Sequence, residues 1–216
     1  MGVNLLHYKQ LKDQLPKDVS LCIISKHHPK EDILRYYELG ERQFGENRVQ
    51  ELSKKLDLPK DIEWHFVGHL QTNKVKQVIP YVSCVQSVDS IKLAKEIDQE
   101  CKKINKVMPI YAQFHLALED ENKYGLKKEE ASSFFEECKD LSNINLCGMM
   151  VMGPHTDNQE RIKEVFNQAK QLFQTLQKDY PNLTTLSMGM SDDYPIAIQC
   201  GSTMVRIGSY LFEGDE

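Results

Sequence analysis

The sequence predicts an α/β protein of the (β/α)8 TIM-barrel class, on three observations. Eight short apolar runs recur along the 216-residue chain, the pattern of buried strands in a parallel sheet. A helix-like stretch separates each run from the next. No Gly-x-Gly-x-x-Gly follows the first run and no Gly-x-x-x-x-Gly-Lys-Ser/Thr occurs, so the nucleotide-binding signatures of open sheets are missing. An open doubly wound sheet is the alternative fold.

The predicted strands are, in order, Val19–Ser25, Gln43–Gly45, Glu63–Val67, Val82–Gln86, Met108–Leu116, Ile144–Met150, Leu183–Ser187 and Met204–Ile207. The predicted helices are Leu5–Leu15, before the first strand, and then Glu31–Leu39, Val49–Leu56, Lys74–Ile79, Ile91–Ile104, Lys128–Lys139, Gln159–Asp179 and Tyr194–Gln199. The clearest helix begins with Asp157 and Glu160 as a capping-box pair and carries one apolar stripe. Strict alternation predicts parallel strands with right-handed crossovers, and eight such units favour closure into a barrel. We therefore treat residues 1–216 as one domain.

Composition indicates a globular protein and excludes several classes of partner. With 40% hydrophobic and 27% charged residues, the chain can bury a full core. The net charge is −5 and lysines are scattered among glutamates, so we expect no nucleic-acid partner. No apolar run is long enough for a signal peptide or membrane anchor, so we expect a cytoplasmic protein without membrane contact. The widely spaced cysteines, predicted to be reduced, are Cys22, Cys84, Cys101, Cys138, Cys147 and Cys200.

Residues directly after the strands of a barrel share one face, where active sites lie. Lys26 closes the first strand. A lysine leaving an apolar strand is ordinarily a solvated surface residue, but at the barrel mouth its amine is placed to attack an aldehyde. The loop Ser187–Asp193 follows the seventh strand, and its glycine and serine suit backbone N–H groups that face an anion. The other interpretation of this loop is that Ser191 caps a helix.

Arg206 stands alone as a charge in the apolar last strand, which Gly208 and Ser209 follow. A buried arginine needs a partner, because an unpaired buried charge is costly. A carboxylate from a neighbouring strand is one candidate partner. The other is a bound ligand, with Gly208 and Ser209 completing a phosphate cup.

The histidines do not predict a metal site. His65 and His69 are four residues apart, but Trp64–Gly68 is typical of a strand, so the two imidazoles would not share a helical face. No acidic ligand accompanies them. No Gly-x-Ser-x-Gly elbow occurs, so a nucleophile triad has no local support either.

Five separated motifs then occur in order: Ser25-Lys26, Gly45–Glu51, Trp64–Lys74, Ser187–Asp193 and Gly201–Ser209. Together they resemble the YggS/PROSC group of pyridoxal phosphate homeostasis proteins over nearly the whole chain. The resemblance implies a barrel like the N-terminal domain of alanine racemase and pyridoxal 5′-phosphate (PLP) as the cofactor. The segment Phe114–Gly125 departs from the family pattern, because it is bulkier and more acidic than the usual polar, small-residue stretch.

The resemblance also implies a role for each cofactor-binding residue. Lys26 would carry the Schiff base, and Arg206 would face the pyridine nitrogen. Asn47 would contact the ring side of the cofactor, and His69 would lie at the rim. The phosphate would be held by Ser191, Gly208, Ser209 and the backbone around Met190.

These roles favour a carrier of PLP over an enzyme with robust turnover. A permanent cation at the pyridine nitrogen weakens the electron sink that PLP catalysis needs. Racemases of this fold resemble the arrangement but take a tyrosine from an additional domain of the partner subunit, and we expect none here because the chain ends at Glu216. We therefore expect a monomer that serves PLP homeostasis and delivers the cofactor to apo-enzymes. The alternatives are a fold-type III amino-acid racemase or related lyase and, third, a Schiff-base aldolase without cofactor.

Overall fold

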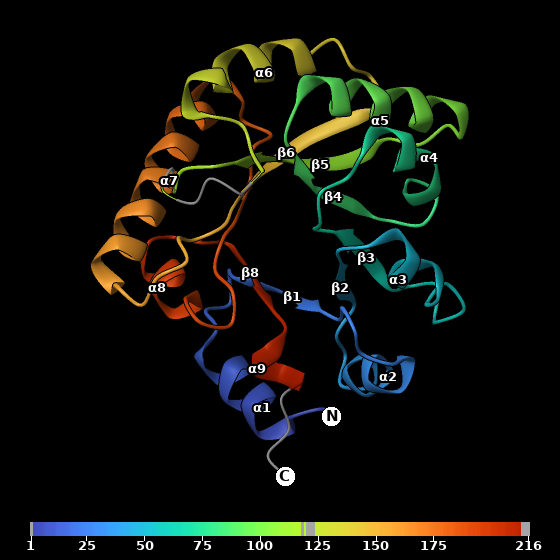
Figure 1. The fold of residues 1–216 in the computed structure, drawn as a ribbon, viewed down its shortest axis with the longest axis vertical. Helices are drawn as coiled ribbons and strands as arrows, with labels where there is room; N and C mark the ends of the chain where they lie inside the picture. The colour runs from blue at the N-terminus through green and yellow to red at the C-terminus, as the bar shows by residue number, and fades with distance from the viewer. Residues whose placement is uncertain (1, 118, 120–123, 213–216) are drawn as a thin grey trace.

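Eight parallel strands close into a barrel in sequence order (Figure 1). The computed structural model describes residues 2–117, 119 and 124–212. Closure is direct, because β8 pairs with β1 and places Ser20 opposite Met204. The strands are β1 (Ser20–Ile24), β2 (Gln43–Glu46), β3 (Glu63–Phe66), β4 (Cys84–Val88), β5 (Met108–Phe114), β6 (Ile144–Val151), β7 (Thr185–Ser187) and β8 (Met204–Ile207). The predicted barrel is confirmed, and the open-sheet alternative is wrong.

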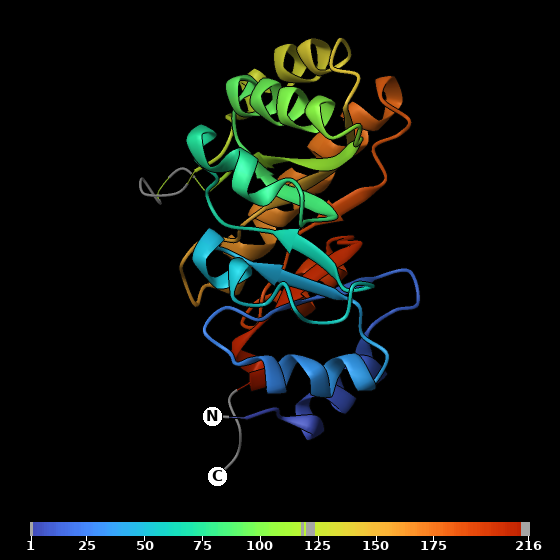
Figure 2. The ribbon, with the colours of Figure 1, turned by 90° about the vertical axis from the view of Figure 1, so that its right-hand side faces the viewer.

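Helices cover the outside of the barrel (Figures 1 and 2). They are α1 (Leu5–Gln14), α2 (Lys30–Glu38), α3 (Val49–Ser53), η1 (Thr72–Lys74), α4 (Val75–Val78), α5 (Ile91–Lys103), η2 (Lys128–Glu130), α6 (Ala131–Cys138), α7 (Gln159–Asp179), α8 (Tyr194–Gln199) and α9 (Ser209–Phe212). The single turn α9 was not predicted, because four residues are too few to show a helical period. It lies against α1, where the Asn4 backbone N–H donates to the carbonyl of Leu211 at 2.8 Å.

The start of α7 differs from the prediction by one residue. Asn158, not Asp157, is the N-cap, and its side-chain oxygen accepts the backbone N–H of Arg161 at 3.2 Å. Asn is as good an N-cap as Asp, so the sequence pattern could not separate the two neighbours. The apolar stripe is confirmed, since all its members are buried: Ile162, Val165, Phe166, Ala169, Leu172, Phe173 and Leu176.

The buried side chains of the barrel strands form parts of two separate hydrophobic clusters. The larger fills the space between strands and helices, and the smaller lies inside the barrel and contains Cys22, Cys84, Tyr111, Met150 and Met204. Successive strand residues point to opposite faces. A residue two positions after a member of the smaller cluster therefore also faces the lumen. Of those positions, towards the carboxyl ends of the strands, three carry buried polar side chains, Gln86, Gln113 and Arg206.

All six cysteines are free thiols, and all but Cys147 are buried. Across residues 2–117, 119 and 124–212, no helix combines the length and hydrophobicity that a membrane crossing requires.

Candidate functional site

Lys26 lies in a turn at the carboxyl end of β1. The carbonyl of Ser25 accepts the backbone N–H of His28 at 3.1 Å, which closes the turn with Lys26 and His27 at its centre. His27 has a φ of 67°, in the left-handed region that a residue with a Cβ rarely occupies. The side chain of Lys26 is exposed, so its amine is accessible at the mouth of the barrel.

A buried ion pair that sequence reasoning missed lies behind this turn. The ammonium of Lys55 is 2.6 Å from Oε1 of Glu46, and the two side chains are 4% and 0% exposed. The same ammonium donates to the carbonyl of Ser25 at 2.8 Å, and the Ser25 hydroxyl donates to Glu46 at 2.7 Å. In sequence, Lys55 resembles any solvated lysine at the end of a helix, so no local signal distinguished it.

Asn47 follows β2 directly and brings an unpaired acceptor to the same end of the barrel. Its Oδ1 atom is buried and finds no hydrogen-bond partner among the described residues. Gly68, after β3, packs against it so closely that a Cβ there would lie 2.1 Å from the Asn47 carbonyl oxygen. Buried polar atoms are nearly always hydrogen-bonded, so this acceptor is suited to a ligand donor.

Arg206 points into the lumen from β8 and is 4% exposed. Its Nη1 donates to the carbonyl and the hydroxyl of Ser187 at 2.9 and 2.8 Å, and its Nη2 donates to the carbonyl of Val151 at 3.1 Å. Burial lowers the pKa of Arg206 to about 10, against the opposing effects of Cys22 and Asp193. Of the two expected partners, a carboxylate is wrong for the described part of the chain, where neutral oxygens hold the guanidinium. Those bonds use three of its five N–H donors and leave two for a ligand.

The polar contacts of Arg206 continue across the lumen. The Ser187 hydroxyl donates to Oε1 of Gln86 at 2.7 Å, and Nε2 of Gln86 contacts Nδ1 of His65 at 2.7 Å. Burial lowers the pKa of His65 to about 4, so its imidazole is neutral and accepts from the amide. Together with Val151, the hydrogen-bonded groups that fix the orientation of Arg206 come from five strands, β3, β4, β6, β7 and β8.

The predicted phosphate loop, Ser187–Asp193, is bonded to the segment that follows β8. The Ser191 hydroxyl oxygen accepts the backbone N–H groups of Gly208 and Tyr210 at 3.4 and 3.3 Å, so it joins the β7 loop to the start of α9. Capping of α8 by Ser191 is therefore wrong: Asp193 precedes that helix. The backbone N–H of Met190 is occupied, because it donates to Oδ1 of Asp193 at 2.6 Å.

The structure brings Ser191, Gly208 and Ser209 together, as the sequence predicted, on the rim next to β1. Gly208 approaches that strand closely, and a Cβ there would lie 3.2 Å from the carbonyl oxygen of Ile24. Burial raises the pKa of Asp193, whose side chain turns back to the Met190 backbone. Asp193 is thus held by the loop itself.

His69 lies at the rim, as the resemblance implied. Its Nδ1 is 3.1 Å from Oδ2 of Asp89, and its ring stacks on that of Tyr124 with centroids 3.8 Å apart. Among the described residues, no three His, Cys, Asp or Glu side chains group as metal ligands. The atypical segment Phe114–Gly125 lies partly outside the described residues. In the described part of this segment, Glu119 accepts two hydrogen bonds from Arg161, each at 2.8 Å.

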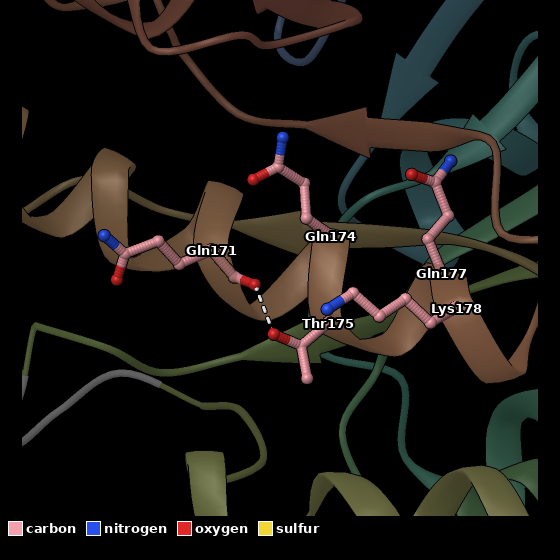
Figure 3. Close-up of a pocket in the computed structure, with 5 residues that line it drawn as sticks. All are labelled: Gln171, Gln174, Thr175, Gln177 and Lys178. Atoms are coloured by element: carbon pink, nitrogen blue, oxygen red, sulfur yellow. Dashed lines mark hydrogen bonds between the residues drawn. The ribbon is translucent and has the colours of Figure 1, made fainter.

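A hollow on the outer surface of α7 is unrelated to these groups. It is lined by Gln171, Gln174, Thr175, Gln177 and Lys178, and the Thr175 hydroxyl donates to the Gln171 carbonyl at 2.9 Å (Figure 3). All its residues belong to the carboxyl-terminal half of one helix, which leads away from the mouth. We interpret it as the solvated face of an amphipathic helix.

The fold and the strand-end residues define the class of protein. A family model described as "Alanine racemase, N-terminal domain" matches residues 6–215, so the chain is a barrel of the alanine racemase N-terminal-domain class. Within that class, the chain belongs to the family of pyridoxal phosphate homeostasis proteins, and the resemblance drawn from its motifs is confirmed. A protein of that name from Aquifex aeolicus is 40% identical over 191 residues, which cover 87% of this chain and 83% of the relative.

Two further comparisons agree. A pyridoxal phosphate homeostasis protein from Pasteurella multocida is 36% identical over 217 residues, covering 97% of this chain and 92% of the relative. A solved structure of PipY from Synechococcus elongatus with PLP bound is 34% identical, has a TM-score of 0.89, and covers 96% of this chain and 98% of its own.

Proposed function

We propose that this protein binds PLP as a Schiff base on Lys26 and serves intracellular PLP homeostasis and delivery. The observation that carries the proposal is that three groups lie at one end of the barrel: an exposed lysine, the Asn47 acceptor and Arg206. Among the described residues, the Asn47 acceptor has no partner and two N–H donors of Arg206 are unused. The PLP-bound relative, PipY, supports it. PLP supplies an aldehyde that condenses with an amine, and a ring that withdraws electrons.

Each residue then has a defined task in holding the cofactor. Arg206 donates to the pyridine nitrogen with its remaining N–H groups, and Asn47 contacts the ring side. Ser191, Gly208 and Ser209 hold the phosphate. Because Asp193 occupies the Met190 N–H, that N–H group contributes to the phosphate site only if this bond opens.

The same arrangement supports binding without robust turnover. The guanidinium of Arg206 is fixed by three hydrogen bonds, and a fixed donor keeps the pyridine nitrogen unprotonated and the electron sink weak. One observation favours the alternative of an amino-acid racemase or lyase: the His69–Asp89 pair is an acid–base group at the rim. The cofactor-free aldolase is less favoured, because it gives Arg206 no ligand.

The remaining assignments are part of this proposal. Residues 1–216 form one PLP-binding domain, the protein acts as a monomer in the cytoplasm, and apo-PLP enzymes receive the cofactor. The match of one family model to residues 6–215 supports the single domain.

Lys26→Ala tests the attachment site. The variant should keep its far-ultraviolet circular dichroism, because the side chain is exposed, and should lose the visible absorbance of bound PLP after dialysis. In the wild type, borohydride should add the mass of the reduced cofactor to the peptide that contains Lys26. Retention of the yellow band by Lys26→Ala would show attachment elsewhere. Rapid racemisation of amino acids by the wild type would replace the carrier proposal with the enzyme alternative.

A further inference from the structure

The burial of the Lys55–Glu46 ion pair requires a physical explanation. Two charges that are 4% and 0% exposed have lost nearly all their hydration, and a buried ion pair seldom stabilises a fold more than apolar residues of the same volume. Oε2 of Glu46 also has no hydrogen-bond partner within residues 2–117, 119 and 124–212, which adds to the cost. In some proteins, buried polar or ionic groups confer conformational specificity rather than stability.

The geometry that this pair fixes is the Lys26 turn. The Ser25 carbonyl accepts two hydrogen bonds, from the His28 backbone N–H that closes the turn and from the Lys55 ammonium. The Ser25 hydroxyl donates to Glu46. Both the carbonyl and the side chain of Ser25, the residue before Lys26, are therefore held in place. Lys55 follows α3 and Glu46 ends β2, so the contact ties the turn to two neighbouring elements.

The turn needs this support because its backbone is strained. His27 has a φ of 67°, and a left-handed conformation is unfavourable for a residue with a Cβ. His27 is exposed, so its side chain has little packing to compensate for that strain. Without the bonds to the Ser25 carbonyl, residue 27 would relax towards negative φ and redirect the lysine before it.

We propose that Lys55 and Glu46 are positioning residues for Lys26: the ion pair holds the Ser25–His28 turn in its strained form and so aims the Lys26 amine at the aldehyde of PLP. The inference rests on the proposed Schiff base. In the condensation, the Lys26 nitrogen and the aldehyde carbon form a C=N bond, and the aldehyde oxygen leaves as water with two protons from the amine. Lys55 and Glu46 neither gain nor lose a bond in this step.

The test compares two ligands that share a phosphate and a ring. PLP has the aldehyde, whereas pyridoxamine 5′-phosphate has an amine there and cannot form the Schiff base. In the paired variant Lys55→Met/Glu46→Gln, no charge is left unpaired and Gln can still accept from Ser25. We expect PLP attachment to Lys26 to become at least about tenfold slower, a change of about 1.4 kcal/mol in the barrier, while pyridoxamine 5′-phosphate affinity stays within about twofold.

The matched control removes an exposed ion pair of similar length. Lys95 and Glu137 are 2.8 Å apart and 49% and 47% exposed, and Lys95→Met/Glu137→Gln should match the wild type for both ligands. Attachment at the wild-type rate in Lys55→Met/Glu46→Gln would overturn the inference. Equal losses for the two ligands would also overturn it, because the pair would then support the whole site and not Lys26.

A second pair of variants tests the turn without touching the charges, and His27 is exposed, so both should fold. His27→Gly can adopt the left-handed conformation without strain and should keep fast attachment. His27→Val makes that conformation costlier and should slow attachment at least about fivefold, with pyridoxamine 5′-phosphate binding unchanged. Equal rates in these two variants would refute the role of the turn.

Failure of the proposed function and failure of this inference alone give different results. If wild-type protein forms no reducible bond at Lys26, the Schiff-base proposal fails and this inference fails with it. If the wild type forms that bond and the variants form it equally fast, only the inference fails.

Discussion

Removing Lys55 alone should be far more damaging than its place at the end of a helix suggests. Lys55→Met deletes the 2.6 Å contact to Glu46 and the 2.8 Å bond to the Ser25 carbonyl. It leaves the Glu46 carboxylate fully buried, with one hydroxyl donor for Oε1 and, from the described chain, none for Oε2. Breaking a buried pair by removing one partner costs about 3–5 kcal/mol, because the remaining charge is uncompensated.

That free energy gives a measurable shift in thermal unfolding. For a chain of this length, each kcal/mol lowers the midpoint by about 2–4 °C, so Lys55→Met should lower it by roughly 6–20 °C. Glu46→Gln in the same chain should recover most of the loss, because the double variant leaves no unpaired charge. Thermal unfolding of the wild type, both single variants and the double variant, followed by circular dichroism, completes a double-mutant cycle for the pair.

Lys95→Met is the matched single-site control, since it removes one partner of an exposed pair and should leave the midpoint nearly unchanged. Melting of Lys55→Met within about 2 °C of the wild type, or of the double variant no higher than Lys55→Met, would contradict the assigned cost of the unpaired carboxylate. Either result would mean that water or a backbone shift compensates Glu46.

Two further predictions concern the lumen and the rim. The pKa of His65 is about 4 in the folded protein and 6.5 as an ordinary histidine, so the unfolded chain binds a proton first as pH falls. Stability should therefore be present at about pH 7 and fall by about 2 kcal/mol at about pH 5, measured by urea unfolding. His65→Gln should show a smaller fall; an equal fall would assign it to other groups. Gly68→Ala places a Cβ 2.1 Å from the Asn47 carbonyl oxygen, so PLP affinity should drop at least about tenfold, whereas wild-type affinity would show that the strand end adjusts.

The hydrogen-bonded lumen explains why Arg206 can be buried without a carboxylate. Each guanidinium bond goes to a carbonyl or hydroxyl oxygen, and the Ser187 hydroxyl donates its own hydrogen bond to Gln86. The Gln86 amide in turn donates to the neutral His65, so this chain of hydrogen bonds brings no second charge to Arg206. This arrangement preserves a cation whose remaining donors are available to a ligand.

The sequence determined the architecture and the strand-end residues of this protein. Periodicity depends on neighbours only a few residues apart, so eight strands, their order and the α7 stripe could be predicted locally. Lys26, Asn47 and Gly208 could be placed because a parallel barrel brings the residues after its strands to one face. Arg206 could be placed because side chains alternate between the two faces of the last strand, β8. The five ordered motifs also predicted the family, which the relatives confirm.

Only the tertiary structure decided what each of those residues contacts. Lys55, nine positions after Glu46 in sequence, became a buried partner because α3 folds back over the ends of β1 and β2. Ser191 bonds to Gly208 across 17 residues, which turned an apparent helix cap into a link between two loops. Hydrogen bonds and desolvation depend on which distant atoms exclude water from a group. Such contacts are set by packing of the whole barrel, and no local pattern contains them.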